Sequence, residues 1–422
     1  MAEQIQRSIH KFGGASVKDA EAIRRVGHLL ANHLSPEEQA VVVVSAMGKT
    51  TNALEEVWRS SGHEQEGRWD DILQAHLDVA AELGLDVAHR LQSVFESSWQ
   101  EAQSAQRESL TEAAYDAFVS AGELASTTLV SAWCSTQGLE AAWWDVRETL
   151  RTSGPHRHAR VDEGALWDAG TSLRAACASS QVVVTQGFIG RHDSGRTSTL
   201  GREGSDYSAS LLAVAVGAES VTIWKDVPGM MNADPKWHPE AQTVPKVDHA
   251  EALELSYYGA SVIHPRTVKP LQQRGLPLWI RSFLAPEGPA TLIDDFPDLV
   301  PDQPMFIWRD EQVWVEVATS DQSFLAEDHL KDLFSALNRA GVHVRMMQQH
   351  ATHFGLVTDR DDIRLESLAE FLGLAFDVRR EDGLLLLTVR HGDATVVQEL
   401  TAGREVVVEQ VAGVTTRRLM RN

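Results

Sequence analysis

The sequence predicts an α/β fold in which helices sandwich an open, mainly parallel sheet, followed by a smaller α+β region. Apolar, β-branched runs such as residues 40–44 alternate with helical segments as far as residue 280, which is typical of a parallel sheet. Beyond residue 304 the segments become shorter and follow a strand–helix–strand–strand scheme. The prolines that crowd between the two parts indicate a domain boundary: Pro286, Pro289, Pro297, Pro301 and Pro304.

Composition narrows the class of protein. At 422 residues the chain has room for two or three domains of about 150 residues each. The net charge of −22 argues against nucleic acid or an anionic membrane surface as the main partner. Cys134 and Cys177 are too few for a disulfide framework or a zinc cluster. With no signal segment and no apolar run near the roughly 18 residues of a membrane span, we expect a cytoplasmic protein without a membrane partner.

The first strand, turn and helix form a candidate phosphate site. Residues 8–12 are predicted to form a strand, and residues 17–31 carry apolar side chains at helical spacing. In the turn between them, Gly13 and Gly14 let backbone N–H groups approach an anion, which Lys11 can also reach. The alternative is a plain connection with a solvated lysine.

The strand at residues 40–44 leads into a second turn whose Gly-Lys-Thr sequence resembles a P-loop. A P-loop needs a glycine five residues before Gly48, and Val43 stands there inside the strand. The P-loop interpretation therefore fails. Hydroxyl groups at Ser45 and Thr51 remain as the polar groups of this turn.

The middle of the chain is predicted to be mostly helical up to residue 138 and to return to strands at 139–146 and 182–186. Glu123, near the start of a helix, is by itself typical of a surface carboxylate. A basic loop lies between the two strands. Since no acids or cysteines stand at ligand spacing, a solvated loop is favoured over a metal site. Its basic residues are His156, Arg157, His158 and Arg160.

A glycine-flanked turn at residues 199–204 continues into a helix. Gly201 and Gly204 flank an Arg-Glu pair, and Ser205 and Asp206 follow. Such a turn collects unpaired backbone N–H groups at the positive end of a helix, which suits an anion. The alternative is an ordinary helix start with Ser205 or Asp206 as the N-cap.

The strand predicted at residues 220–224 ends in a turn that carries Lys225 and Asp226. Charged groups at the carboxyl end of a strand lie where open α/β sheets place their ligands. A helix at 250–258 follows, and residues 278–280 are expected to form the last strand of this domain.

The tail is predicted to hold two consecutive βαββαβ modules, ferredoxin-like in outline, of which the second is short. Nothing in this region indicates catalysis. The expected strands of the first part of the tail lie at 313–318, 342–349 and 354–358, with helices at 327–340 and 363–372. The segments 376–379, 384–389, 394–401, 405–410 and 415–419 are expected to repeat the scheme in abbreviated form, with 376–379 and 384–389 as separate strands.

Four separated motifs resemble, in the same order, those of the aspartate kinases of the amino-acid kinase superfamily. Residues 11–16 are similar to the family's KFGGTS, and residues 200–207 to its LGRGGSD. Residues 225–235 resemble (T/K)DVPG…DP, and residues 259–265 resemble GA(K/Q)V(L/M)HP. The resemblance implies an amino-acid kinase catalytic domain over 1–298. It also implies paired ACT regulatory modules over 299–422.

The implied reaction transfers the γ-phosphoryl group of ATP to the side-chain carboxylate of L-aspartate and gives 4-phospho-L-aspartate. This is the first step of the aspartate pathway to lysine, threonine and methionine. Mg²⁺ would arrive on the nucleotide, since it commonly binds through phosphates and water. The ACT modules imply a homodimer joined through them and feedback inhibition by lysine, threonine or both.

The resemblance also implies roles residue by residue, with no dedicated metal ligand. The catalytic residues are Lys11 and Asp206. The residues for the amino-acid substrate are Ser45, Thr51, Glu123, Arg202, Gly204 and Ser205. The residues for the nucleotide are Lys11, Gly13, Gly14, Lys225, Asp226, Met231, Lys236 and Ser261. The chain departs from the commonest pattern at Ala15 (Thr), Glu203 (Gly), Met231 (Tyr), Lys236 (Arg) and Ser261 (Lys).

Two other functions are compatible with parts of this pattern. A kinase of another acid, such as N-acetylglutamate, has no reason to carry two tail modules. A non-catalytic protein that only senses an amino acid through its tail has no reason to keep Lys11, Arg202 and Asp206 together. Aspartate kinase is therefore the favoured interpretation.

Overall fold

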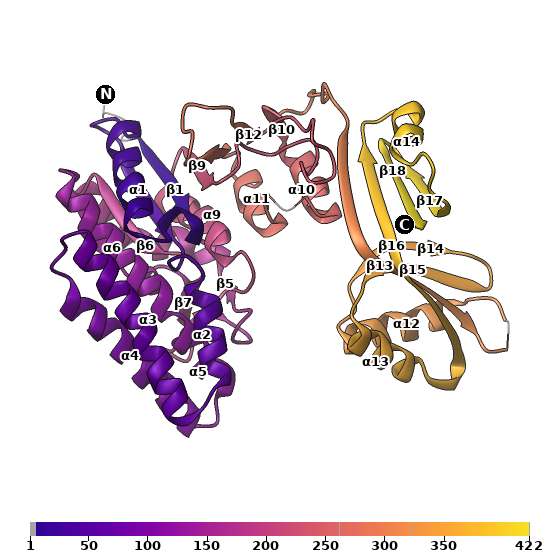
Figure 1. The fold of residues 1–422 in the computed structure, drawn as a ribbon, viewed down its shortest axis with the longest axis horizontal. Helices are drawn as coiled ribbons and strands as arrows, with labels where there is room; N and C mark the ends of the chain where they lie inside the picture. Colours follow the sequence, from indigo (N-terminus) through magenta and orange to yellow (C-terminus); the bar gives the residue numbers. More distant parts are fainter. Residues whose placement is uncertain (1–5, 261, 322, 422) are drawn as a thin grey trace. The chain divides into compact units, whose positions relative to one another are not determined.

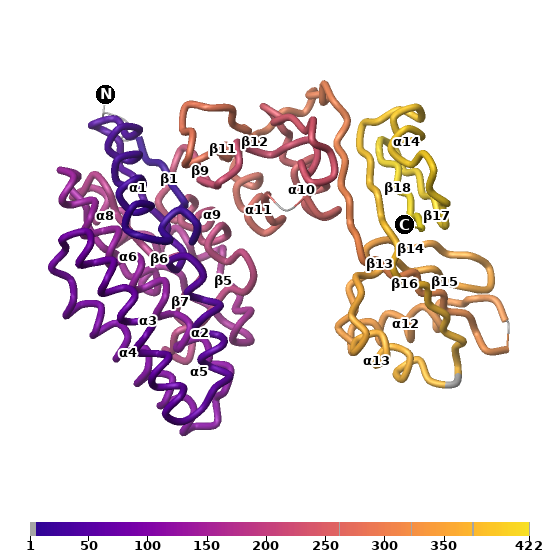
Figure 2. Tube along the Cα trace, in the orientation of Figure 1, coloured from indigo at the N-terminus to yellow at the C-terminus, as the bar shows by residue number. Residues whose placement is uncertain are grey.

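The computed structural model describes residues 6–260, 262–321 and 323–421, whose trace is drawn in Figure 2. The chain forms two compact units. The first unit runs to Leu299 apart from two short excursions. The second unit holds the residues from Val300 onward together with those excursions, Met231–Gln242 and Tyr258–Ala260.

The first unit is built on an eight-stranded sheet in the order β10-β12-β11-β9-β1-β2-β6-β3. Every neighbouring pair of strands is parallel except β11 and β12. The mainly parallel sheet predicted from the sequence is confirmed. Its strands are β1 (Arg7–Phe12), β2 (Gln39–Val44), β3 (Ala141–Trp144), β6 (Val182–Gln186), β9 (Ser220–Lys225), β10 (Lys246–Asp248), β11 (Leu278–Ser282) and β12 (Thr291–Asp294).

Strand β12 corrects the expectation that residues 278–280 form the last strand of the domain. β12 lies inside the proline-rich stretch, which was predicted to be a boundary, and it pairs antiparallel with β11. The Thr291 hydroxyl donates a hydrogen bond to the Val244 carbonyl at 2.7 Å, which anchors the strand in the first unit. A four-residue strand among prolines carries no periodic signal that sequence reasoning can detect.

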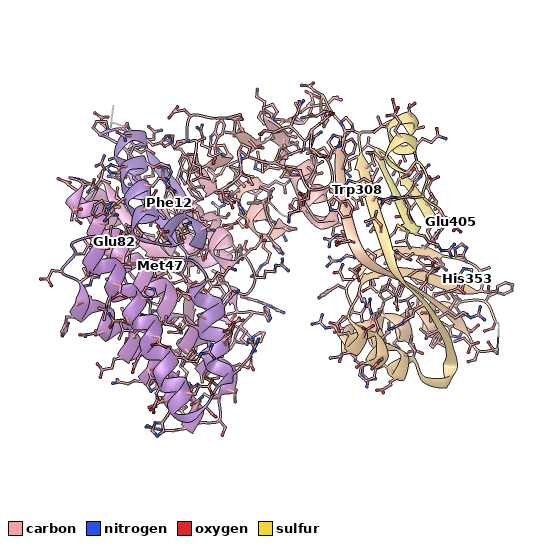
Figure 3. All side chains as sticks on the ribbon, viewed as in Figure 1. Phe12, Met47, Glu82, Trp308, His353 and Glu405 are labelled. Carbon is pink, nitrogen blue, oxygen red and sulfur yellow. The ribbon has the colours of Figure 1, made fainter. Side chains whose placement is uncertain are left out.

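Helices pack on this sheet, as the sequence predicts (Figure 1). Apolar side chains of the strands and of α1 and α6 share one core, in which Phe12, labelled in Figure 3, is fully buried. Helix α9 is buried along its whole length, which its continuous apolar run at residues 211–216 favours. In the part of the chain that is described, no helix is long and apolar enough to cross a membrane. The helices of this unit are α1 (Ala20–His33), α2 (Thr50–Arg59), α3 (Gly62–Glu82), α4 (Ala88–Arg107), α5 (Thr111–Val119), α6 (Ala121–Thr136), α7 (Leu166–Ala169), α8 (Thr171–Ala178), α9 (Gly204–Val216), α10 (His249–Tyr258) and α11 (Pro265–Gln272).

A small four-stranded sheet in the same unit, in the order β5-β4-β7-β8, leads the chain into α9. β4 pairs parallel with β7, and the other two pairs are antiparallel. These strands are too short for their alternation to be visible in the sequence. They are β4 (Arg151–Ser153), β5 (Arg160–Val161), β7 (Ile189–His192) and β8 (Thr197–Thr199).

The second unit contains a six-stranded antiparallel sheet in the order β14-β15-β13-β16-β18-β17. Three helices accompany it (Figure 1): α12 (Glu327–Ala340), α13 (Asp362–Leu372) and α14 (Ala394–Leu400). Its strands are β13 (Met305–Thr319), β14 (Val344–Gln349), β15 (His353–Asp359), β16 (Phe376–Arg390), β17 (Val406–Ala412) and β18 (Thr415–Arg421). The predicted α+β character of the tail is confirmed.

Two ferredoxin-like modules share this sheet, but they are nested and not consecutive. The later half of β13, α12, β14, β15, α13 and the early half of β16 make one βαββαβ module. The later half of β16 continues into α14, β17 and β18, and it pairs with the early half of β13, where Met305 faces Arg390. The strands expected at 376–379 and 384–389 are therefore one strand of 15 residues. The residues between the two expected strands continue the same strand.

Candidate active site

A cavity of about 570 Å³ opens in the first unit where the carboxyl ends of β1, β2 and β9 meet. This is the edge of a parallel sheet at which ligands commonly bind. The cavity brings together nine residues that the sequence assigned to the site: Lys11, Ser45, Thr51, Glu123, Arg202, Gly204, Ser205, Asp206 and Lys225.

Asp206 lies between two lysines at the centre of this group. Lys11 Nζ lies 2.6 Å from Asp206 Oδ1, and Lys225 Nζ lies 3.4 Å from Asp206 Oδ2. The parallel pairing of β1 with β9 places the two lysines on neighbouring strands, and the first turn of α9 carries the aspartate. Burial by itself would raise the pKa of Asp206, but the two ammonium groups outweigh it and hold that pKa below its ordinary value. Asp206 is therefore ionised and paired at neutral pH.

The turns after β1 and β2 pack backbone against backbone beside Lys11. The Gly48 N–H donates to the Gly14 carbonyl at 3.0 Å. A Cβ at Gly14 would lie 2.5 Å from the Gly48 carbonyl oxygen, so only glycine fits there. This close approach keeps the Gly13–Gly14 peptide next to the lysine, as a phosphate-binding turn requires.

Helix α9 begins at Gly204, so the alternative in which Ser205 or Asp206 is the N-cap is wrong. The N-cap is Glu203, whose φ of 54° lies in the left-handed region and whose side chain makes no capping hydrogen bond. Ser205 and Asp206 lie instead in the first turn of the helix. The Gly204 N–H donates to the Gly201 carbonyl at 3.0 Å. Because no side chain caps this turn, the N–H groups of Ser205 and Asp206 remain available to an anion.

Glu123 is a buried carboxylate and not the surface group that a lone glutamate suggests. It is 3% exposed and accepts a hydrogen bond from the Ala46 N–H at 3.4 Å. Its Oε2 has no hydrogen-bond partner among the described residues. Burial raises the pKa of Glu123 to about 8, although hydrogen bonds from Ala46 and Thr51 act in the opposite direction. Burial therefore favours the protonated form of this side chain at neutral pH.

Nine cavity-lining residues are absent from the site predicted from the sequence. Two of them, Arg157 and His158, belong to the basic loop that was interpreted as solvated; both are exposed, yet they form part of the cavity wall. No cluster of three or more metal-ligating side chains occurs among the described residues. The other residues absent from the predicted site are Asn52, Glu55, Tyr115, Phe188, Thr199, Gly201 and Glu203.

The residues assigned to the nucleotide are spread more widely. Gly13 and Gly14 lie in the turn after β1, and Asp226 directly follows Lys225 at the end of β9. Met231 and Lys236 belong to the second unit, and the backbone N–H of Lys236 donates to Asp234 Oδ1 at 2.9 Å. Ser261 lies outside the described residues. The nucleotide assignments therefore stay predictions.

Comparison with known proteins identifies close structural relatives. The crystal structure of E. coli aspartokinase III in complex with aspartate and ADP (R-state) matches with a TM-score of 0.82 and 26% identity, covering 99% of this chain and 96% of that one. The same enzyme in complex with lysine and aspartate (T-state) matches with a TM-score of 0.80 and 27% identity, covering 98% and 95% of the two chains.

Sequence comparison agrees. Lysine-sensitive aspartokinase 3 of Escherichia coli (strain K12) is 30% identical over 414 residues, which cover 94% of this chain and 89% of that protein. Bifunctional aspartokinase/homoserine dehydrogenase 2 of the same organism is 35% identical over 295 residues, which cover 68% of this chain and 36% of that longer protein. The model of the amino acid kinase family matches residues 6–282. This chain therefore belongs to the amino acid kinase family, among its aspartokinases.

Proposed function

We propose that the protein transfers the γ-phosphoryl group of ATP to the side-chain carboxylate of L-aspartate, producing ADP and 4-phospho-L-aspartate. This would be the first step of the route from aspartate to lysine, threonine and methionine. The observation that carries the proposal is the buried Asp206 held between Lys11 and Lys225 at the carboxyl edge of a parallel sheet. It is supported by E. coli aspartokinase III, which matches this fold and was solved with aspartate and ADP.

The chemistry needs positioning and charge balance more than covalent help. A carboxylate oxygen of aspartate attacks the γ-phosphorus while the bond to the ADP oxygen breaks. Because the attacking carboxylate is already ionised, no general base is required. The barrier is the repulsion between two anions, and Lys11, Lys225 and the N-terminus of α9 would reduce it. Mg²⁺, carried by the nucleotide phosphates, would neutralise further negative charge on the transferred group.

At the acceptor end, Arg202 and Glu123 would bind the two charged groups on the α-carbon of the amino acid. Arg202 would grip the α-carboxylate through its planar guanidinium. Glu123 would face the α-ammonium, and that cation would favour the ionised form of Glu123. Hydroxyl groups would complete the pocket: Ser45, Thr51 and Ser205. Gly204 would let the substrate approach the helix start.

At the nucleotide end, Gly13 and Gly14 would contact phosphate oxygens through their backbone, together with Lys11 and Lys225. The remaining assignments follow from the motifs of the family: Asp226, Met231, Lys236 and Ser261 would hold ribose, adenine and phosphates. Met231 in place of tyrosine would cover an adenine face by dispersion alone.

Regulation would act through the tail. We propose that the nested modules are ACT modules within the segment 299–422, that they join two chains into a homodimer, and that lysine, threonine or both inhibit the enzyme. E. coli aspartokinase III was solved with lysine bound in its T-state, which supports an amino-acid effector. The cytoplasm, where these metabolites occur, is the proposed location.

The test is ADP release from MgATP, measured with L-aspartate and, separately, with N-acetyl-L-glutamate. We expect turnover with L-aspartate alone, and a loss of several orders of magnitude in Lys11→Ala because the charge that screens the phosphates is removed. Turnover of N-acetyl-L-glutamate would indicate a kinase of another acid. The absence of turnover with either acceptor would indicate a sensing protein and refute the proposal.

A further inference from the structure

The basic loop at residues 154–160 reaches the cavity because one buried carboxylate holds it. Asp116 in α5 is fully buried. His156 Nδ1 lies 2.8 Å from Asp116 Oδ2, and the Arg157 N–H donates to the same oxygen at 2.9 Å. The hydroxyl of Thr199, at the end of β8, donates to Asp116 Oδ1 at 2.7 Å. Asp116 therefore fixes the loop at the cavity wall.

Arg157 is held in a backbone conformation that side chains disfavour. Its φ of 65° lies in the left-handed region, where glycine is accommodated without steric cost. A side chain kept at such a position beside a cavity points to a use for that side chain. The strain therefore points to a function of the guanidinium group.

The guanidinium group of Arg157 is placed by the same helix that anchors its backbone. Its central carbon lies 3.9 Å from the centre of the Tyr115 ring, and its Nη1 lies 3.4 Å from the Glu112 carboxylate. The Tyr115 hydroxyl donates to Glu55 Oε1 at 2.5 Å, which fixes the ring under the arginine. Tyr115, Glu55 and Arg157 all line the cavity.

The charges around the cavity indicate what a second arginine would do there. Lys11 and Lys225 both pair with Asp206, so part of their positive charge is already balanced by that carboxylate. An acceptor with two carboxylates brings further negative charge into the same cavity. A planar guanidinium, ionised at every physiological pH, is well suited to a carboxylate. Arg157 therefore adds to Arg202 a second group of this kind.

Resting on the proposed aspartate kinase activity, we infer that Arg157 is a second substrate-binding arginine for the dicarboxylate acceptor, and that Asp116 is the positioning residue that holds it at the cavity. Arg157 contacts the acceptor beside Arg202. Asp116 does not touch the substrate and acts through the loop.

Arg157→Gly separates this role from a structural one, because glycine suits the left-handed backbone. We expect KM for L-aspartate to rise roughly tenfold, the effect of losing one charge-assisted hydrogen bond, while KM for ATP stays unchanged. The melting temperature should stay the same or rise, and the shift in melting temperature produced by L-aspartate should shrink. Arg160→Ala, an exposed arginine in β5 that does not line the cavity, is the matched control and should leave both KM values unchanged.

Asp116→Asn tests the positioning role. It should raise KM for L-aspartate while kcat and KM for ATP stay close to those of the wild type. If the wild-type enzyme turns over aspartate and Arg157→Gly leaves KM for L-aspartate unchanged, this inference is refuted. The proposed function then stands. A wild-type enzyme that does not turn over aspartate refutes the proposed function itself.

Discussion

Two carboxylates of the same cavity are equally buried, but their pKa values are shifted in opposite directions. Asp206 and Glu123 are each 3% exposed. Asp206 faces two lysines, and its pKa is held below the ordinary value. Glu123 has no basic side chain within 4 Å among the described residues and accepts a backbone hydrogen bond, so burial raises its pKa to about 8. The region around Asp206 holds fixed charges, whereas the region around Glu123 is close to neutral.

The difference shows that the neighbours of a buried carboxylate decide whether it is ionised or protonated. Around Asp206 the charges are present before substrate arrives, which suits the phosphoryl end of a transfer reaction. Around Glu123 the charge would appear when an ammonium group enters, because a nearby cation favours the ionised carboxylate. The acceptor end would thus be matched to an amino acid and not to a plain anion.

The largest expected effect comes from removing the charge of Asp206. Asp206→Asn would leave Lys11 and Lys225 without their counter-charge, so we expect a loss of about 3 kcal/mol in the free energy of unfolding. ADP release should fall by about a hundredfold or more. Urea denaturation and the ADP assay measure the two effects, with the exposed Asp193→Asn as control. If Asp206→Asn kept the stability and turnover of the wild type, the proposed difference between the regions around Asp206 and Glu123 would be refuted.

A smaller and more selective effect is expected at Glu123. Glu123→Gln replaces a mostly protonated acid by a neutral amide of the same shape, so folding should be retained. KM for L-aspartate should rise roughly tenfold because the ammonium loses its counter-charge, while KM for ATP stays the same. Steady-state kinetics with each substrate varied in turn checks this. An equal change in both KM values would indicate a structural defect in place of a substrate contact.

The raised pKa of Glu123 also fixes the direction of a pH effect on stability. Between about pH 4.5, where an unfolded glutamate titrates, and the folded value of about 8, the folded state keeps a proton that the unfolded state has lost. This group therefore makes the wild type less stable as pH rises through that window. Glu123→Gln should lack this contribution, so its stability relative to wild type should increase from about pH 5 to about pH 8.5. Denaturant melts of both proteins measure the difference, and parallel curves would contradict the assignment.

The smallest effect is expected at a third carboxylate, Glu203. Its backbone is left-handed and its Oε2 is buried without a hydrogen-bond partner among the described residues. Glu203→Gly removes both the backbone strain and the unpaired buried oxygen. We therefore expect a gain of about 1 kcal/mol in the free energy of unfolding, with turnover within about twofold of wild type. A thermal melt and the ADP assay suffice. A tenfold loss of activity would give Glu203 a role in the reaction.

The part of the site that lies at strand ends was accessible from the sequence. The strands at residues 8–12, 40–44 and 220–224 are continuous apolar runs because both faces of a parallel sheet are buried. Their carboxyl ends meet at one edge of the sheet, so Lys11 and Lys225 were expected there. Local pattern and the geometry of parallel sheets together predict this convergence.

The remainder depends on contacts that leave no local pattern. Asp116 and Arg157 are 41 positions apart and meet through a hydrogen bond between a buried side chain and a loop backbone. Nothing in the periodicity of either segment indicates that contact. The raised pKa of Glu123 also arises from tertiary structure, because it is caused by burial that the local sequence does not reveal. In the tail, two separate strands were expected where pairing with β13 makes one long strand, β16.

Because the two tail modules are nested, the inner module is an insertion within the outer one. Gln312 and Leu384 are paired across β13 and β16, so the chain enters and leaves the inner module at neighbouring points. The insert still depends on its host, because Met346 and Val357 of the inner module share a hydrophobic cluster with Leu386 and Leu419 of the outer one. The host depends on its own strands as well: ending the chain after the inner module would strip residues 305–309 of the β16 partners with which they pair. The two modules are therefore a host and its insert that are held by a common core.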